Sequence, residues 1–441
     1  MLTYHLSLAV RSLRRTPILS GLMIGAIALG VGVFVTTLTV YRLMSGNPLV
    51  HRNDVLYAVT LDSMDPNRPW DDDHPERPAP ELTYQDAMAL LESDIPVRRV
   101  AMRKAAFVVD PAAEKAKEAK PFLIEGRLTT KDFFAMFDVP FRYGGGWDAA
   151  ADANAQPVVV LSSDTNEKAF GGTDSVGQTI RLDGRDFKIA GVLAEWAPTP
   201  KVYDLNNGAF DEIEGVFMPF SVGIALALPS AGNTNCWRNQ SIESFRDFLG
   251  ADCLWIQFWA ELPDADRAEA FQAHVDNYAR TQKERGRFER ALNNRLYHPD
   301  EWLRVNEAVH DDNRVLVGLS FMFLGVCLLN MIGLLLAKFL GTAPVVSLRR
   351  ALGASKAMIF RQHLVEVAVL GFAGGVLGLG VAALGLIGVR GLYENYESLT
   401  RLDVTTGMVA LSIAVVSGMI AGLYPTWRVC STSPAAHLKT Q

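Results

Sequence analysis

The segment VVSLRRALGASKAMIFRQHLVEVAVLGFAGGVLGL (Val345–Leu379) joins a short basic stretch to a long apolar one. Its first part carries four cations, whereas only small, aliphatic and aromatic residues follow Glu366. This change predicts an exposed basic helix that leads into a membrane-spanning helix. A basic connector between two spans is a place where a soluble partner can bind a membrane protein.

Four segments of the chain lack Asp, Glu, Lys and Arg over 23 to 26 residues. A helix needs about 20 apolar residues to cross the hydrocarbon core of a bilayer. Only a helix or a closed barrel keeps backbone amides paired in lipid. The sequence therefore predicts an α-helical membrane protein with four transmembrane helices, whose charge-free cores are Thr16–Tyr41, Val315–Ala337, Val367–Val389 and Val404–Trp427.

The distribution of Lys and Arg predicts how these helices are oriented. Ten cations lie before the first span, between the second and third, and after the fourth, with no carboxylate before Glu366. Positively charged loops remain cytoplasmic, so both termini are expected on the cytoplasmic side of the inner membrane. The segment between the first two spans has 28 Lys and Arg against 44 Asp and Glu, a net charge of −16. It is expected outside, and its acidity argues against nucleic acid as a partner.

The first residues predict an amphipathic helix on the inner surface of the membrane, because Leu2, Leu6 and Leu13 share one helical face. The apolar run that follows is too long for a signal peptide and is expected to be an uncleaved anchor. The predicted parts are a cytoplasmic amphipathic helix (1–17), transmembrane helix 1 (18–44), a periplasmic α+β domain (45–312), transmembrane helix 2 (313–338), a cytoplasmic connector helix (339–361), transmembrane helix 3 (362–389), a short periplasmic loop (390–403), transmembrane helix 4 (404–428) and a cytoplasmic tail (429–441).

The large acidic segment alternates strand-like and helix-like patterns. Asp183-Gly184 between Thr179–Leu182 and Phe187–Leu193 is a strong hairpin signal. Asp264–Arg290 is expected to form one long helix. Glu301–Asn313 contains no helix breaker and is expected to continue into the second span as a stalk.

Two short strands, Phe107–Val109 and Phe122–Glu125, are expected earlier in this domain. Thr129–Phe137 is expected to be a helix capped by one of its two threonines.

Four cysteines are present. Cys236 and Cys253 lie in the outside segment, where an oxidising compartment permits a disulfide; a bond between them and two unpaired buried thiols both remain open. Cys327 and Cys430 fall within or next to spans and are expected to be reduced. The acidic cluster Asp71–Asp73 lacks the spacing and central glycine of an EF-hand, so no metal site is predicted.

The motifs of common catalytic sites are missing from the sequence. There is no His-x-x-Glu-His, Cys-x-x-Cys or G-x-S-x-G pattern, and Gly144–Gly146 lacks the Lys-Ser/Thr of a P-loop. The chain is therefore predicted not to be an enzyme and to bind no cofactor. The glycines in the spans, together with a lack of charged residues inside them, predict no conduction path through the four helices.

One span, a large outside domain, and three further spans with a basic connector resemble the permease class of FtsX, MacB and the lipoprotein-releasing Lol transporters. Leu348–Ser355 (LRRALGAS) resembles the connector motif R-x-x-G-A-x of that class, and Val158–Leu193 looks like its extracytoplasmic core module. Phe360–Glu366 resembles the start of its third span, and Ser433–Ala435 resembles its tail motif.

The resemblance implies a type VII ABC architecture, in which mechanical movement passes through the membrane. MacB carries a fused ATPase before its first span, whereas only about fifteen residues precede it here, so a separate ATPase that binds ATP-Mg is expected. The connector residues expected to contact that ATPase are Leu348, Arg349, Arg350, Leu352, Gly353 and Ala354. The alternative is a basic loop held at anionic lipid.

The resemblance also implies a second permease subunit, either an identical copy or a paralogue. Three functions follow from the members of the class. The favoured one is MacB-like efflux of a periplasmic substrate with a periplasmic adaptor and an outer-membrane channel. The alternatives are an FtsX-like relay that activates a periplasmic enzyme and a Lol-like extraction of lipoproteins.

Overall fold

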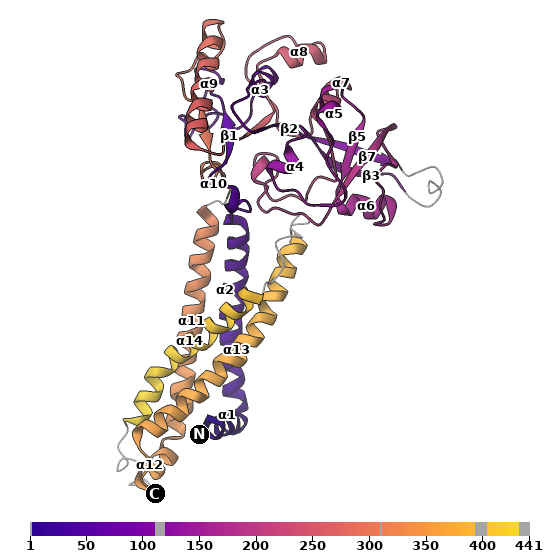
Figure 1. The fold of residues 1–441 in the computed structure, drawn as a ribbon. Coiled ribbons are helices and arrows are strands. Elements are labelled where there is room, and N and C mark those ends of the chain that lie inside the picture. The colour runs from indigo at the N-terminus through magenta and orange to yellow at the C-terminus, as the bar shows by residue number, and fades with distance from the viewer. Residues whose placement is uncertain (1, 111–119, 309–310, 393–403, 432–441) are drawn as a thin grey trace. The chain divides into compact units, whose positions relative to one another are not determined.

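The computed structural model describes residues 2–110, 120–308, 311–392 and 404–431 (Figure 1). The chain divides into two compact units. The helical unit comprises Met1–Ser45 and Val309–Gln441, and the sheet unit comprises Gly46–Ala308. The boundaries between them fall close to the ends of the predicted outside domain.

The helical unit contains four helices that are long and apolar enough to cross a membrane, which confirms the four predicted spans. α2 packs against both α11 and α13, and α13 also packs against α14. Helices of this unit are α1 (Leu2–Arg15), α2 (Pro17–Ser45), α11 (Asp311–Gly341), α12 (Ala343–Ala351), α13 (Lys356–Leu392) and α14 (Val404–Cys430).

Small residues let these helices approach closely, as they commonly do in lipid. A Cβ atom built on Gly418 of α14 would lie 3.4 Å from Cα of Gly371 in α13. A Cβ atom on Gly32 of α2 would lie 2.6 Å from Cβ of Val381. The glycines therefore mark where α13 contacts its two neighbours.

The connector differs from the single helix expected over 339–361. Its helical part, α12, ends at Ala351, and α13 begins at Lys356. Gly353, between them, has a φ of +100°, a conformation that glycine adopts readily and other residues avoid. The basic segment is therefore a short helix followed by a sharp turn.

The prediction that residues 301–313 continue into the second span as a stalk is wrong. α10 (Pro299–Val305) ends well before α11 begins at Asp311. Asn306 caps α10, and Glu307 has a φ of +49°, which is incompatible with a continuing helix. Two separate helices thus occupy the stretch predicted to be one.

The sheet unit is built on a ten-stranded sheet in the order β12-β1-β11-β2-β3-β8-β5-β7-β4, with β6 pairing with β2 and β7. The pairs β3–β8 and β5–β7 are parallel. Its strands are β1 (Leu56–Thr60), β2 (Arg98–Asp110), β3 (Phe122–Thr129), β4 (Phe141–Gly144), β5 (Val158–Leu161), β6 (Thr179–Leu182), β7 (Arg185–Leu193), β8 (Val216–Pro219), β11 (Gln257–Glu261) and β12 (Arg295–Tyr297), and β9 (Asn235–Cys236) pairs separately with β10 (Cys253–Leu254).

Both faces of this sheet are covered by apolar cores. Successive side chains of a strand point to opposite faces, so Phe258 of β11 packs in one core and Trp259 in the other. The first core includes residues of α3 (Tyr84–Leu91) and α9 (Ala265–Glu284). The second includes residues of α4 (Phe133–Met136) and α10. The remaining helices of the unit are α5 (Ala149–Ala153), α6 (Ser163–Phe170), α7 (Phe220–Ala225) and α8 (Phe245–Gly250), with 3₁₀ turns η1 (Val50–Arg52) and η2 (Val202–Asp204).

Several local predictions for this unit fit the structure and others do not. The hairpin forms from β6 and β7, and Asp183 and Gly184 have φ angles of +47° and +73°, as a type I′ turn requires. α9 ends at Glu284 rather than Arg290, because Gly286 turns the chain at a φ of +80°. The helix expected over 129–137 shortens to α4, and its first residue, Thr129, is the last residue of β3 instead.

Candidate functional site at the connector

The connector helix α12 is defined by its terminal residues. Pro344 stands in its first turn, where a missing N–H is tolerated. The chain turns at Gly353, and Ser355 then starts α13 by accepting a hydrogen bond on its Oγ from the Met358 backbone N–H over 3.2 Å. A serine in this position stabilises a helix start. The sequence Leu-Gly-Ala-Ser therefore encodes the break between the two helices.

The two faces of α12 have different surroundings. Ala343 and Val346 are buried in the helical unit. Val345 and Leu348 are each 53% exposed, and Leu352, just beyond the helix, is 79% exposed. These three residues, spaced three and four apart, form an exposed apolar row at helical spacing. We call this set the connector row.

The structure gives the six predicted contact residues different surroundings. Leu348 and Leu352 are exposed, whereas Ala354 packs against the core of the helical unit. Arg349 donates to Oε1 of Gln362 over 3.2 Å, and Arg350 donates to the carbonyl oxygen of Cys430 over 3.4 Å.

Gly353 forms the turn described above. The assignment of these residues to an ATPase contact stays a prediction. Sequence reasoning overlooked Val345, although its apolar side chain one turn before Leu348 was a signal for it.

A groove of about 320 Å³ lies beside the connector, between the start of α13 and the end of α14. Arg350 reaches the same end of α14 through Cys430. The groove carries two cations and a tryptophan that is 58% exposed. The residues that line it are Lys356, Ala357, Phe360, Arg361, Trp427, Cys430 and Ser431.

The expectation that no charged residue lies inside the spans is wrong. Lys338 of α11 and Glu366 of α13 are both buried, and Nζ of Lys338 lies 2.6 Å from Oε1 of Glu366. The charge-free segments of the sequence end just short of both residues, whereas the helices continue through them. The absence of a conduction path stays a prediction.

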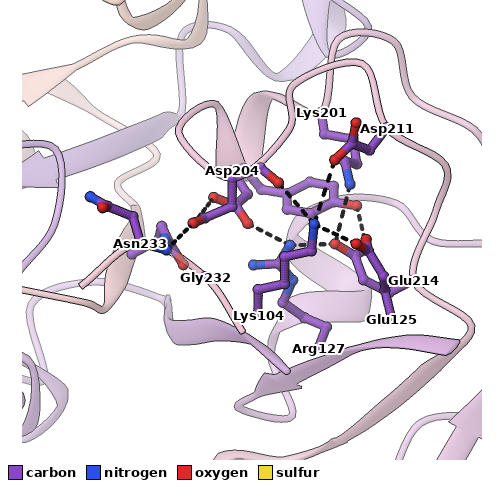
Figure 2. Close-up of polar contacts among 12 residues, drawn as sticks. Lys104, Glu125, Arg127, Lys201, Asp204, Asp211, Glu214, Gly232 and Asn233 are labelled. Atoms are coloured by element: carbon purple, nitrogen blue, oxygen red, sulfur yellow. Dashed lines mark hydrogen bonds and ion pairs between the residues drawn. The ribbon is translucent and has the colours of Figure 1, made fainter. Parts of the chain in front are cut away.

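A buried ionic cluster lies in the sheet unit (Figure 2). Arg127 of β3 places Nη2 2.6 Å from Oδ2 of Asp204 and also contacts Oε1 of Glu214. Lys201 lies 3.5 Å from the same Glu214 oxygen, and the Tyr203 hydroxyl donates to Oε2 of Glu214 over 2.9 Å. All five side chains are almost completely buried.

The charges of this cluster balance, since Arg127 and Lys201 face Asp204 and Glu214. Burial alone would raise the pKa of Glu214, but the positive charges of Arg127 and Lys201 outweigh it and hold that pKa far below its usual range. Burial and the neighbouring Glu214 raise the pKa of Tyr203. The cluster therefore fastens the chain around Lys201–Glu214 to the sheet and presents no unbalanced charge to a ligand.

Glu81 lies at one side of this cluster and is fully buried. Gln257 donates to its Oε1 over 2.6 Å, and Asn233 donates to its Oε2 over 3.1 Å. Burial and the charge of Asp204 raise the pKa of Glu81 to about 8, although its amide donors, including Asn207, oppose this. Glu81 is thus a titrating group within a closed network.

Lys104 ties a further loop to the sheet. Its Nζ lies 2.7 Å from Oε1 of Glu125 and donates to the carbonyl oxygen of Asn207 over 3.0 Å (Figure 2). Asn207 also donates to Asp204 over 2.7 Å. The segment around Asn207 is therefore held by polar contacts to Lys104 of β2 and to Asp204.

Cys236 and Cys253 face each other across the β9–β10 pair and form a disulfide in the structure. Cys327 and Cys430 are buried thiols. Among the residues that the structure describes, no three His, Cys, Asp or Glu side chains are arranged to hold a metal ion.

Two family descriptions match the chain. Residues 20–278 match the MacB-like periplasmic core domain, and residues 317–434 match the FtsX-like permease C-terminal domain. The second match contains α12 and the groove beside it. The matches therefore cover the sheet unit as far as residue 278, together with the connector.

Proteins with related sequences include exporters from several bacteria. The pyoverdine export ATP-binding/permease protein PvdT of Pseudomonas entomophila is 23% identical over 328 residues, which cover 74% of this chain and 44% of that protein. The macrolide export ATP-binding/permease protein MacB of Rhodopirellula baltica is 22% identical, covering 65% of this chain and 41% of that protein. The chain thus spans less than half the length of the curated relatives it matches.

Solved structures that match part of the chain include the periplasmic region of MacB from Actinobacillus actinomycetemcomitans. The TM-score is 0.38 at 10% identity, with 59% of this chain and 98% of that chain covered. The extracellular domain of the transporter YknZ from Gram-positive bacteria has a TM-score of 0.34 at 13% identity, with 55% of this chain and 98% of that chain covered.

Proposed function

Since this chain belongs to the family defined by the MacB-like periplasmic core domain and carries an FtsX-like permease domain, we propose that it is the permease subunit of an ABC transporter driven by a separate ATPase. ATP-Mg binds and is hydrolysed on that partner. The connector receives the resulting movement, and the spans transmit it to the periplasmic domain.

The connector row is the observation that carries this proposal. Val345 and Leu348 on α12, and Leu352 directly after it, expose apolar side chains, and this helix of nine residues is too short to cross a membrane. Apolar anchors at helical spacing are how a helix docks into the groove of a partner. A basic helix that lies in the lipid headgroup region also uses an apolar row, so the purification experiment below separates an ATPase contact from a lipid contact.

The cations around the row favour an acidic partner surface. Arg349 is exposed beside Leu348, and Lys356 and Arg361 line the adjacent groove. Arginine forms forked hydrogen bonds with carboxylates. We therefore assign the ATPase a groove with an apolar floor and an acidic rim, which fits over α12.

The names of the relatives point to export as the activity served by this movement. PvdT is named for pyoverdine export and MacB for macrolide export. We propose that this chain supports efflux of a periplasmic substrate, as a dimer of permeases with a periplasmic adaptor and an outer-membrane channel. Cross-linking of the tagged chain in cells should capture an adaptor, whereas capture of a cell-wall hydrolase instead would favour the signal relay.

Purification of the tagged chain from native membranes tests the ATPase contact. An ABC ATPase should co-purify and hydrolyse ATP in the complex. Leu348→Glu combined with Leu352→Glu should remove it, because two charges then replace two of the three apolar side chains of the connector row. Val97→Glu, at a 52% exposed valine of the sheet unit, is the matched control and should retain it.

Arg349→Glu alone should weaken the association. It is preferred to Arg350→Glu because the hydrogen bond of Arg349 to Gln362 is exposed, whereas Arg350 makes a part-buried contact with the end of α14. If the double leucine variant keeps a full complement of ATPase, the connector is not the contact.

A further inference from the structure

The helical unit contains a buried ion pair between Lys338 and Glu366. The side chains of Lys338 and Glu366 are 2% and 3% exposed, and the distance between their charged atoms is 2.6 Å. An ion pair inside a membrane bundle is expensive to bury, and such residues commonly serve a function. Replacing a buried pair with apolar residues is often neutral or stabilising, so stability alone does not account for it.

Polar groups from two further helices complete the pair. Ser12 of α1 donates to Oε1 of Glu366 over 2.6 Å, and Lys338 donates to Oγ of Ser20 in α2 over 3.3 Å. Nδ1 of His363 lies 3.6 Å from the other carboxylate oxygen of Glu366. Four helices, α1, α2, α11 and α13, therefore meet at these two charges.

The position of the pair in the chain relates it to the connector. Lys338 lies in the last turn of α11, Glu366 lies in the third turn of α13, and all of α12 lies between them. The pair closes the base of the loop that carries the connector row. Next to it, the ring of Phe339 packs against the ring of His363 with centroids 4.3 Å apart.

We propose that the Lys338–Glu366 ion pair is a clamp that makes α11 and α13 move together when the connector is displaced. Separating the two buried charges would leave each of them without its partner, which is strongly unfavourable. A displacement of α12 therefore reaches both helices as one body instead of spreading them apart. This role of Lys338 and Glu366 as positioning residues rests on the proposed function of the connector.

Ser12 extends the clamp to α1. Its hydrogen bond to Glu366 attaches the amphipathic N-terminal helix to the base of the connector loop. α1 also packs along α13 (Figure 1). The first helix is thus part of the moving body and not only a membrane-surface anchor.

The test compares three forms of the full-length chain in nanodiscs. They are the natural chain, Lys338→Met with Glu366→Met, and the charge-swapped Lys338→Glu with Glu366→Lys. Spin labels at Leu340 and Met358, which are 46% and 49% exposed, report the distance between α11 and α13 beside the clamp. The methionine pair is expected to fold and melt like the natural chain, since apolar residues replace the pair.

The natural chain and the charge-swapped chain should show one narrow distance distribution, and the methionine pair should show a broadened one. A narrow distribution in the methionine pair would overturn the clamp. This measurement uses the permease alone. It therefore tests whether the ion pair holds α11 and α13 together even if no ATPase binds the connector.

A second measurement uses the complex with the ATPase. With the methionine pair, the ATPase should still co-purify and hydrolyse ATP, but nucleotide-dependent movement of labels in the sheet unit should be lost and should return in the charge-swapped chain. Undiminished movement in the methionine pair would also overturn the proposal. Loss of the ATPase from the natural chain would instead contradict the proposed function.

Discussion

A Cβ atom on Gly374 of α13 would lie 2.6 Å from Cβ of Ile27 in α2. The two helices are therefore in contact at a distance that only glycine permits. Ile27 itself is completely buried, so it has no open space into which it could move. This contact sets the separation of the first and third spans.

Gly374→Ala should destabilise the bundle by about 1–3 kcal/mol, the usual cost of overpacking. A thermal unfolding curve of the purified chain in detergent measures the effect. Gly380→Ala in the same helix is the matched control, because nothing lies within 4 Å of a Cβ atom there. The control should be neutral or slightly stabilising, since alanine favours a helix over glycine; equal destabilisation by both variants would contradict the contact.

The stability of the sheet unit should depend on pH through Glu81. Its pKa rises from 4.5 to about 8 on folding, so between these values the folded chain keeps a proton that the unfolded chain has lost. The free energy of unfolding contributed by this group therefore falls as pH rises from about 4.5 to about 8. Hydrogen exchange of the β11 amides across this range measures it.

Glu81→Gln should remove that part of the pH dependence, because glutamine does not titrate. Glu269→Gln, at an exposed position of α9, should leave the pH profile as it is in the natural chain. An unchanged profile in Glu81→Gln would show that another group is responsible.

Arg127→Met should destabilise the sheet unit by about 3–5 kcal/mol, because it leaves Asp204 and Glu214 buried without their main counter-charge. Denaturant unfolding followed by tryptophan fluorescence measures the loss, since Trp255 and Trp259 are buried in its two cores. Arg181→Met breaks an ion pair whose partners are 55% and 59% exposed, and it should cost no more than about 1 kcal/mol. Similar losses in both variants would refute the importance of the buried cluster.

Reduction of the Cys236–Cys253 disulfide should lower the free energy of unfolding by about 3 kcal/mol, as expected for a closed loop of this length. The two cysteines are separated by 17 positions. A chain with both cysteines replaced by serine should unfold at the same denaturant concentration with and without reductant. A natural chain that is insensitive to reductant would contradict the bond.

Local patterns were sufficient for several elements of this protein. The four charge-free segments correspond to α2, α11, α13 and α14, because no other secondary structure buries its own backbone in lipid. Asp183-Gly184 located a hairpin, because few residues adopt two successive positive φ angles.

The stalk and the long strand β2 were not predicted correctly. Residues 301–313 contain no breaker, yet α10 ends at Val305. β2 runs from Arg98 to Asp110, although only its last residues look like a strand. Its two buried cations, Arg103 and Lys104, obscure the apolar alternation that would have indicated it.

The connector was recognisable from its residues, but the roles within it were not. LRRALGAS indicated a basic exposed segment, whereas the structure separates Leu348 and Leu352, which are exposed, from Ala354, which packs inward. Which side of a short helix faces outward depends on the surface it packs against, and for α12 that surface includes α11 and α14.

The amino-acid sequence by itself determined the number of spans and the hairpin at Asp183-Gly184, because length, hydropathy and turn residues act locally. Only the tertiary structure showed that Lys338 meets Glu366 and that Arg127 meets Asp204 and Glu214. A charged residue near the end of a span or within a strand is ordinarily solvated. Its burial against an opposite charge depends on how distant segments pack, and that packing is decided by the whole fold.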